Sequence, residues 1–294
     1  YFHFATCCMS AAALVSVLLL KGQRVQELIG PHQRPLETYA KAFGFFEAWY
    51  TNSKKRLATV LALWGCSAVS LAIMNLQLGC HQAGEASVAS CLIFVAALAI
   101  LFVVLYCILH VCCALELAID RYCLHVFNVQ VASNSIAQWN VMQALLRRAA
   151  LCVEGGFVAA GTGVLCVMVL TLTEVFHIFG SDDPIDALSH HERICLGLWV
   201  GWVMPLAVLL FYTVFRAAAI TEQCNRVPAL VNSWVFEERE LDREKQHVVQ
   251  HIMHSFAGFY VKGIRLNASV AFKMSYLSGM LLFTFFTQRL LKST

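Results

Sequence analysis

Six long apolar runs constrain the fold of this chain more than any other feature of its sequence. Each is near or above the roughly 20 residues that a helix needs to cross a bilayer. They cover residues 1–20, 57–79, 88–117, 149–180, 194–220 and 268–288. The sequence therefore predicts an all-α, polytopic helical membrane protein with six visible transmembrane helices.

The composition supports a membrane protein. Only 13% of the residues are charged and 59% are hydrophobic, whereas a soluble domain carries about 25% charged residues. The net charge of +3 does not suggest a nucleic-acid partner. Most of the 13 cysteines lie inside apolar runs at spacings that suit no metal, so no cofactor is expected. Cys80 and Cys91 flank a short loop and could pair if that loop is extracytosolic.

Basic residues alternate between the connecting loops and predict the topology. Lysine and arginine gather in the first, third and fifth loops, while residues 80–87 have none and residues 180–193 have Arg193 alone. The positive-inside rule then places the basic loops in the cytosol and both chain ends outside. Residues 21–56, 124–148 and 228–256 are expected to form cytosolic helices. Since Tyr1 already lies in an apolar run, an upstream helix is expected to be missing.

The last sixty residues join a water-facing helix to the final membrane helix. Residues 236–256 are charged, with apolar residues at helical spacing, and Gly258 and Gly263 separate them from the last span. That span has one face of small and hydroxyl residues that ends in bulky apolar groups, which suits a water path with a hydrophobic constriction. A core helix that packs through serine and glycine is the alternative. The candidate pore and gate residues are Ser275, Tyr276, Gly279, Leu282, Phe283 and Phe286.

The fourth span carries ionisable residues where a bilayer makes them costly, namely Glu154, Glu174 and His177. Glu174 and His177 lie three apart on one helical face. They are candidates for a ligand pocket, or for hydrogen bonds between helices. No second Glu-x-x-His motif accompanies them, which disfavours a metal site. Three tryptophans are candidates for the pocket walls: Trp64, Trp199 and Trp202.

Two further motifs in the apolar spans are short. In the fourth span, Gly156 with Ala160 and Ala159 with Gly163 have the small-xxx-small spacing that favours close helix packing. At the inner end of the third span, residues 120–122 read Asp-Arg-Tyr, as in rhodopsin-like G-protein-coupled receptors. The other signatures of those receptors are absent, so this is a second hypothesis.

The C-terminal pattern resembles the arthropod gustatory and odorant receptor family. The resemblance rests on NRVPALVNSWVFEERELDREKQHVVQHIMHSFAGFYVKGIRLNASVAFKMSYLSGMLLF, residues 225–283. Residues 258–260, Gly-Phe-Tyr, stand for the family's Gly-Phe-Phe-like element, and Ser275-Tyr276 stands for its Thr-Tyr. Leu282-Phe283 lies where the family has Gln-Phe. The predicted topology also agrees with this family if one helix precedes Tyr1.

The resemblance implies a chemosensory, ligand-gated, non-selective cation channel rather than an enzyme, with seven spans in the full fold. It implies a multi-pass subunit in the plasma membrane, a homo- or heterotetramer joined by its C-terminal helices, and an extracellular C-terminus. In that reading residues 1–235 hold an outward ligand pocket, 236–262 an anchor helix and 263–294 the pore helix. The partners would be a small-molecule tastant or odorant and the lipid bilayer. A membrane protein of this fold that does not gate is a third hypothesis.

Overall fold

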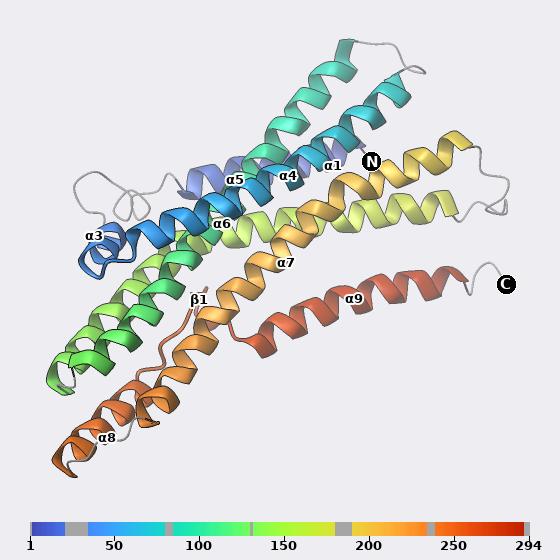
Figure 1. Ribbon diagram of the computed structural model, residues 1–294. Coiled ribbons are helices and arrows are strands. Elements are labelled where there is room, and N and C mark those ends of the chain that lie inside the picture. The colour runs from blue at the N-terminus through green and yellow to red at the C-terminus, as the bar shows by residue number, and fades with distance from the viewer. Residues whose placement is uncertain are drawn as a thin grey trace.

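The computed structural model describes residues 2–20, 35–79, 85–129, 132–179, 190–233 and 239–290. Within these ranges the chain forms eight helices and one two-stranded hairpin (Figure 1). The elements are α1 Phe2–Leu20, α3 Pro35–Ala42, α4 Phe46–Gly79, α5 Glu85–Val129, α6 Ala132–Phe179, α7 His190–Asn232, α8 Arg239–His254, β1 Tyr260–Val261, β2 Ile264–Arg265 and α9 Ala268–Leu290. The expectation of an all-α protein is confirmed.

Four of the described helices are long and apolar enough to cross a membrane. Their qualifying stretches are Phe46–Ile73, Leu92–Asn128, Ser133–Thr173 and Gly201–Asn232, in α4 to α7. The sequence predicted six, and the two outer members of that set do not qualify. In α1 the qualifying apolar stretch is shorter, Cys7–Leu19, and α9 has no such stretch among its described residues. Lys273, near the start of α9, lowers the hydropathy there.

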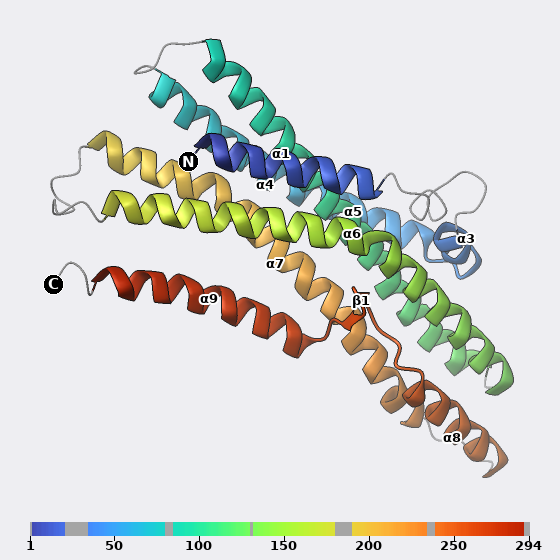
Figure 2. The same cartoon turned by 180° about the vertical axis from the view of Figure 1, so that it is seen from behind.

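Helices α5, α6 and α7 are longer than a bilayer is thick. The 45 residues of α5 span roughly 68 Å at 1.5 Å per residue, against about 30 Å of hydrocarbon. Their apolar parts pack together with α4, and α1 lies against α5 and α6 (Figures 1 and 2). Their other ends project with α8 beyond the bundle. On the predicted topology this projecting end lies in the cytosol.

An aromatic cluster ties α3 to the projecting part of α5. Tyr39 stacks on Phe43 with ring centroids 4.3 Å apart, and Phe43 meets His125 of α5 edge-on at 5.9 Å. Phe45, in the turn after α3, is fully buried. Burial raises the pKa of Tyr39 to about 12, because its phenolate would lose its hydration here. The aromatic residues before the first long helix therefore form packed structure.

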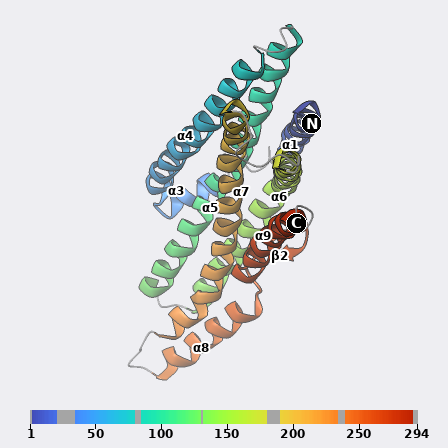
Figure 3. The ribbon, with the colours of Figure 1, turned by 90° about the vertical axis from the view of Figure 1, so that its right-hand side faces the viewer.

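Helix α9 has little support from the rest of its own chain. It packs against α7 and touches α6 only slightly, whereas α4, α5 and α7 pack extensively on one another. All three views show α9 leaving the bundle near the hairpin and running beside it (Figure 3). The apolar core consequently lies among α1 and α4 to α7.

The close crossing of α1 and α6 generates the first prediction. A Cβ added to Gly163 would lie inside van der Waals contact with the Ala12 side chain, so Gly163→Ala must push the helices apart. We expect a loss of about 1–3 kcal/mol, seen as a lower thermal midpoint in detergent. Gly161→Ala is the matched control, since its nearest atom, on Leu210, is 4.0 Å away. Equal midpoints for the two variants would contradict this packing.

Candidate functional site

Three of the predicted pore residues lie in the described part of α9. Tyr276 is 66% exposed, and nothing beyond the helix comes within 4 Å of a Cβ built on Gly279. The Ser275 hydroxyl donates to the carbonyl of Ala271 at 3.0 Å, so it bonds its own helix. The predicted gate side chains lie outside the described part of the structure: Leu282, Phe283 and Phe286.

Apolar side chains are exposed around much of α9. Phe272, Tyr276 and Met280 follow one line at i, i+4 spacing, and Met274 and Leu277 lie on other sides of the helix. The buried part is the start: Ala271 is fully buried, and the described side chains after it are half-buried or exposed. A helix this apolar needs lipid or another chain around it.

The connection between α8 and α9 is a tight β-hairpin. Tyr260 pairs with Arg265, and Val261 pairs with Ile264. The two residues of its turn, Lys262 and Gly263, have φ values of 50° and 78°. Positive φ at both positions is typical of a type I′ turn, whose twist matches that of the strands, and glycine takes it at little cost. Of the two glycines that separate α8 from α9 in the sequence, Gly263 thus belongs to the turn of the hairpin, and Gly258 lies two residues before its first strand.

Two side chains of α7 hold the segments on either side of this hairpin. The hydroxyl oxygen of Thr221 accepts a hydrogen bond from the backbone N–H of Phe259 at 3.0 Å. The carboxylate of Glu222 accepts one from the backbone N–H of Ala268 at 3.2 Å, at the first residue of α9. Phe259 itself is fully buried. The base of α9 is therefore fixed to α7.

The hairpin is held on two further sides. Arg265 donates to the side-chain oxygen of Asn225 in α7 at 2.8 Å and also to a backbone carbonyl, that of Ala257. Glu154 of α6 accepts from the backbone N–H of Lys262 at 3.1 Å, and the Lys262 ammonium lies 3.6 Å from the same carboxylate. Glu154, singled out in the sequence as an ionisable residue in a membrane span, thus anchors the hairpin. We call these contacts of Thr221, Glu222, Asn225 and Glu154 the hairpin clamp.

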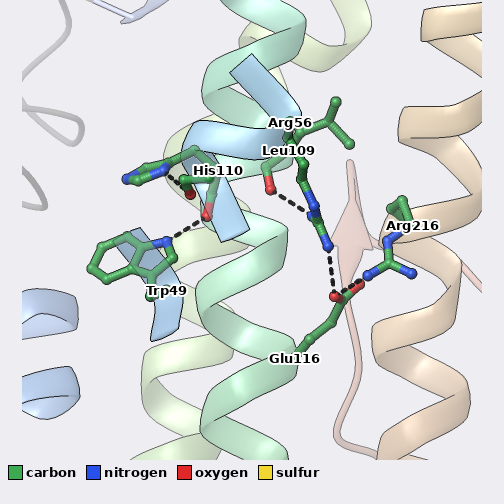
Figure 4. A network of polar contacts seen from close by, with 7 residues as sticks. Trp49, Arg56, Leu109, His110, Glu116 and Arg216 are labelled. Carbon is green, nitrogen blue, oxygen red and sulfur yellow. Dashed lines mark hydrogen bonds and ion pairs between the residues drawn. The ribbon is translucent and has the colours of Figure 1, made fainter. Parts of the chain in front are cut away.

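A second polar centre joins α4, α5 and α7 through one buried carboxylate (Figure 4). Glu116 of α5 has a side chain only 10% exposed, and its Oε2 accepts from Arg56 of α4 at 3.2 Å and from Arg216 of α7. Arg56 also donates to the carbonyl of Leu109 at 3.2 Å. Two guanidinium groups share one carboxylate, so the centre carries one excess positive charge.

A further set of contacts lies nearer the start of α4 on the same helix pair. The Trp49 indole donates to the carbonyl of His110 at 3.0 Å and stacks on its ring at 4.6 Å, as Figure 4 shows. The Ser53 hydroxyl lies 2.6 Å from Nδ1 of the same histidine. Together with Arg56, these contacts fix the start of α4 against the middle of α5.

Sequence analysis missed the Glu116 centre. The sequence does contain an indication of this centre. Glu116 is the one acidic residue within residues 88–117 and lies near the predicted cytosolic end of that span. Arg56 and Arg216 lie near the predicted cytosolic ends of their own spans. An ionisable residue inside a membrane span normally has a partner of opposite charge at the same depth. Pairing charges by depth across the predicted spans would have found it.

The predicted ligand-pocket residues are only partly described. Trp202 of α7 is fully buried and packs edge-on against Phe94 at 4.8 Å. Trp64 of α4 is half-buried, and its indole N–H is buried without a hydrogen-bond partner among the described residues. The side chains of Glu174, His177 and Trp199 lie outside the described part, as do Cys80 and the side chain of Cys91. Among the residues that the structure describes, no ligand set is thus brought together around Trp64 and Trp202.

The Asp-Arg-Tyr tripeptide lies on the projecting part of α5. Tyr122 is fully buried against Trp139 of α6, and its hydroxyl donates to the carbonyl of Ser135 at 3.2 Å. The tyrosine therefore packs the α5–α6 corner. Asp120 is exposed and Arg121 half-buried. In the described ranges, no three histidine, cysteine or acidic side chains are grouped closely enough to hold a metal ion.

Comparison with known proteins identifies no relative. No protein-family model matches the chain, and no curated protein sequence matches it.

Because two arginines share Glu116, we expect loss of the carboxylate to destabilise the protein more than loss of one arginine. Glu116→Gln leaves two half-buried guanidinium groups without an anion, and we expect it to cost about 3 kcal/mol of stability. Arg216→Gln leaves Arg56 paired with Glu116, so it should cost about 1 kcal/mol. Thermal midpoints in detergent should therefore fall much further for Glu116→Gln. A larger loss for Arg216→Gln would refute the shared-carboxylate account.

Close packing at the hairpin clamp predicts that Gly258 tolerates no side chain. A Cβ there would lie 2.7 Å from Nε of Arg265 and 3.0 Å from the Thr221 hydroxyl. Gly258→Ala should displace Arg265 and destabilise the hairpin by about 1–3 kcal/mol. The readout is faster proteolytic cleavage between α8 and α9. Gly65→Ala, which meets nothing within 4 Å, should leave cleavage unchanged; unchanged cleavage in both variants would speak against the clamp.

Proposed function

We propose that this chain is a chemosensory receptor subunit that forms a ligand-gated, non-selective cation channel opened by a small-molecule tastant or odorant. The proposal is supported mainly by the exposure of α9. This apolar helix is fixed to the bundle at its base and is exposed around much of its circumference. Copies of α9 around a common axis would cover that surface and enclose a path. The resemblance to gustatory and odorant receptors supplies the number of copies, four, in a homo- or heterotetramer.

The pore and gate would lie on α9. Ser275, Tyr276 and Gly279 would line the path, and Leu282, Phe283 and Phe286 would form its apolar constriction. A ring of bulky apolar side chains closes a pore by excluding water, and small separations of the helices admit water and ions. The subunit would sit in the plasma membrane with its C-terminus outside.

Helix α7 would couple the ligand to the pore. Its outer half carries Trp199 and Trp202, which with Trp64, Glu174 and His177 would surround the ligand. Its inner half carries Thr221 and Glu222 of the hairpin clamp. A ligand that binds one position of α7 better than another shifts the population of that position. Because the clamp moves with α7, the base of α9 would move with it.

The proposal predicts a ligand-evoked cation current that depends on the constriction. In cells that express the chain, alone or with a co-subunit, patch-clamp recording across a tastant and odorant panel should detect such a current with G-protein signalling blocked. Leu282→Ala and Phe283→Ala remove apolar bulk and should raise the current without ligand. Val208→Ala, an exposed site on α7, is the control and should change nothing.

The same recordings separate the alternatives. Surface expression with no current, together with a G-protein response once signalling is unblocked, would overturn the channel and favour the receptor hypothesis based on Asp120, Arg121 and Tyr122. Surface tetramers with neither response would favour a membrane protein that does not gate.

A further inference from the structure

A polar groove separates α6 from α8 at the projecting end of the molecule. Its volume is about 460 Å³, and all eight residues that line it are polar. Arg147 and Gln143 come from α6, and His247, His251 and His254 come from α8. The three histidines are spaced i, i+4 and i+7, which puts them on one face of α8. The groove is distinct from the hairpin clamp and from the Glu116 centre.

The charge of the groove favours an anion. No aspartate or glutamate lines it, and Arg147 is exposed with no ion-pair partner among the described residues. The three histidine rings add N–H groups that can donate to the oxygens of an anion. Arginine presents a fork of N–H donors that matches phosphate oxygens.

The end of α8 does not oppose an anion strongly, because protein donors occupy exposed backbone acceptors there. The Gln143 amide donates to the carbonyl of Ser255, and Nδ1 of His254 lies 2.8 Å from the carbonyl of Gln250. A carbonyl only accepts, so Nδ1 carries the hydrogen and Nε2 of His254 is left for a ligand. The free carbonyls that give a helix C-terminus its negative character are thus partly satisfied.

The walls of the groove are held in place by contacts between the two helices. The Trp139 indole of α6 donates to the hydroxyl of Ser255 at 2.8 Å, and Trp139 is fully buried. Nε2 of His251 lies 3.0 Å from the side-chain oxygen of Asn140. The positions of α6 and α8 on the two sides of the groove are therefore fixed before any ligand arrives, which lowers the cost of bringing their side chains together around a ligand.

We infer that this groove binds a phosphate-bearing polyanion, either a soluble phosphate ester or the headgroup of an anionic lipid. Arg147 would pair with one phosphate, and the α8 histidines would hydrogen-bond the rest. On the predicted topology the groove faces the cytosol, where both sources occur. Since α8 leads into the hairpin clamp, an occupied groove would fix α8 against α6 next to the base of α9. Binding itself requires no conductance, so its failure and that of the channel proposal are distinguishable.

The test is a binding titration of the purified full-length chain. Inositol hexakisphosphate is the soluble probe, and phosphatidylcholine vesicles with and without phosphatidylinositol bisphosphate are the lipid probes. Arg147→Gln should weaken binding of whichever probe binds by about tenfold or more, since it removes a charged hydrogen-bonding partner. His251→Gln and His254→Gln should each weaken it as well.

Arg243→Gln on α8 is the matched control, because it removes an equal charge from an exposed residue outside the groove. Its affinity should equal that of the unmodified chain. Binding of the hexakisphosphate supports a soluble ligand, and binding of the doped vesicles alone supports a lipid headgroup. No binding of either probe, or equal weakening by Arg147→Gln and Arg243→Gln, would overturn the inference.

Discussion

The structure depends on one carboxylate that is removed from water between three helices. Glu116 can be ionised at a side-chain exposure of 10% because Arg56 and Arg216 reach it from α4 and α7. Taking such charges out of water costs several kcal/mol per ion, and only close partners recover it. Apolar contacts are non-directional, so on their own they fix the axial register of long helices only weakly. A three-way ionic contact at one level fixes their register, and the extra arginine keeps the carboxylate paired when either partner moves.

Helix α7 connects that fixed level to the rest of the molecule. Arg216 holds it against α4 and α5. Five residues further along α7, the fully buried Thr221 begins the hairpin clamp. Glu222 then holds the first residue of α9. Motion of α7 relative to α6 must therefore strain the clamp, because Glu154 of α6 holds the hairpin turn from the other side. This geometry makes the hairpin the place where displacement of the bundle reaches α9.

The sequence predicted the helical class and the long helices well, because bilayer-length apolar runs leave few alternatives. Small-residue spacing also pointed to α6, where Gly163 meets Ala12 of α1. Two features of the structure, the hairpin and the Glu116 centre, were not predicted from the sequence. The hairpin from Tyr260 to Arg265 is too short to show the alternating pattern of β-strands. In the sequence, Gly258 and Gly263 therefore indicate only a separation between two helices. The Glu116 centre arises from residues 60 and 100 positions apart, and local patterns carry no information on such pairings. Only four of the six predicted spans are supported, because within the described residues α1 has a shorter apolar stretch and α9 has none that qualifies.

The exposure of α9 sets this helix apart from α4 to α7, which pack on one another within the chain. The described part of α9 after Ala271 has few partners within the chain, among them Phe215 of α7, whose ring centroid lies 5.4 Å from that of Phe272. The hydroxyls of Ser275 and Ser278 donate to carbonyls of their own helix. Hydroxyl groups bonded in this way tolerate an apolar surround, yet each keeps lone pairs that face outward. The hydroxyls of such a helix have hydrogen bonds within the helix and can also accept hydrogen bonds from water. The helix is therefore compatible both with a closed, dry state and with an open, wet one. That dual compatibility would suit the gated path proposed above, and it follows from the residue types of α9 alone.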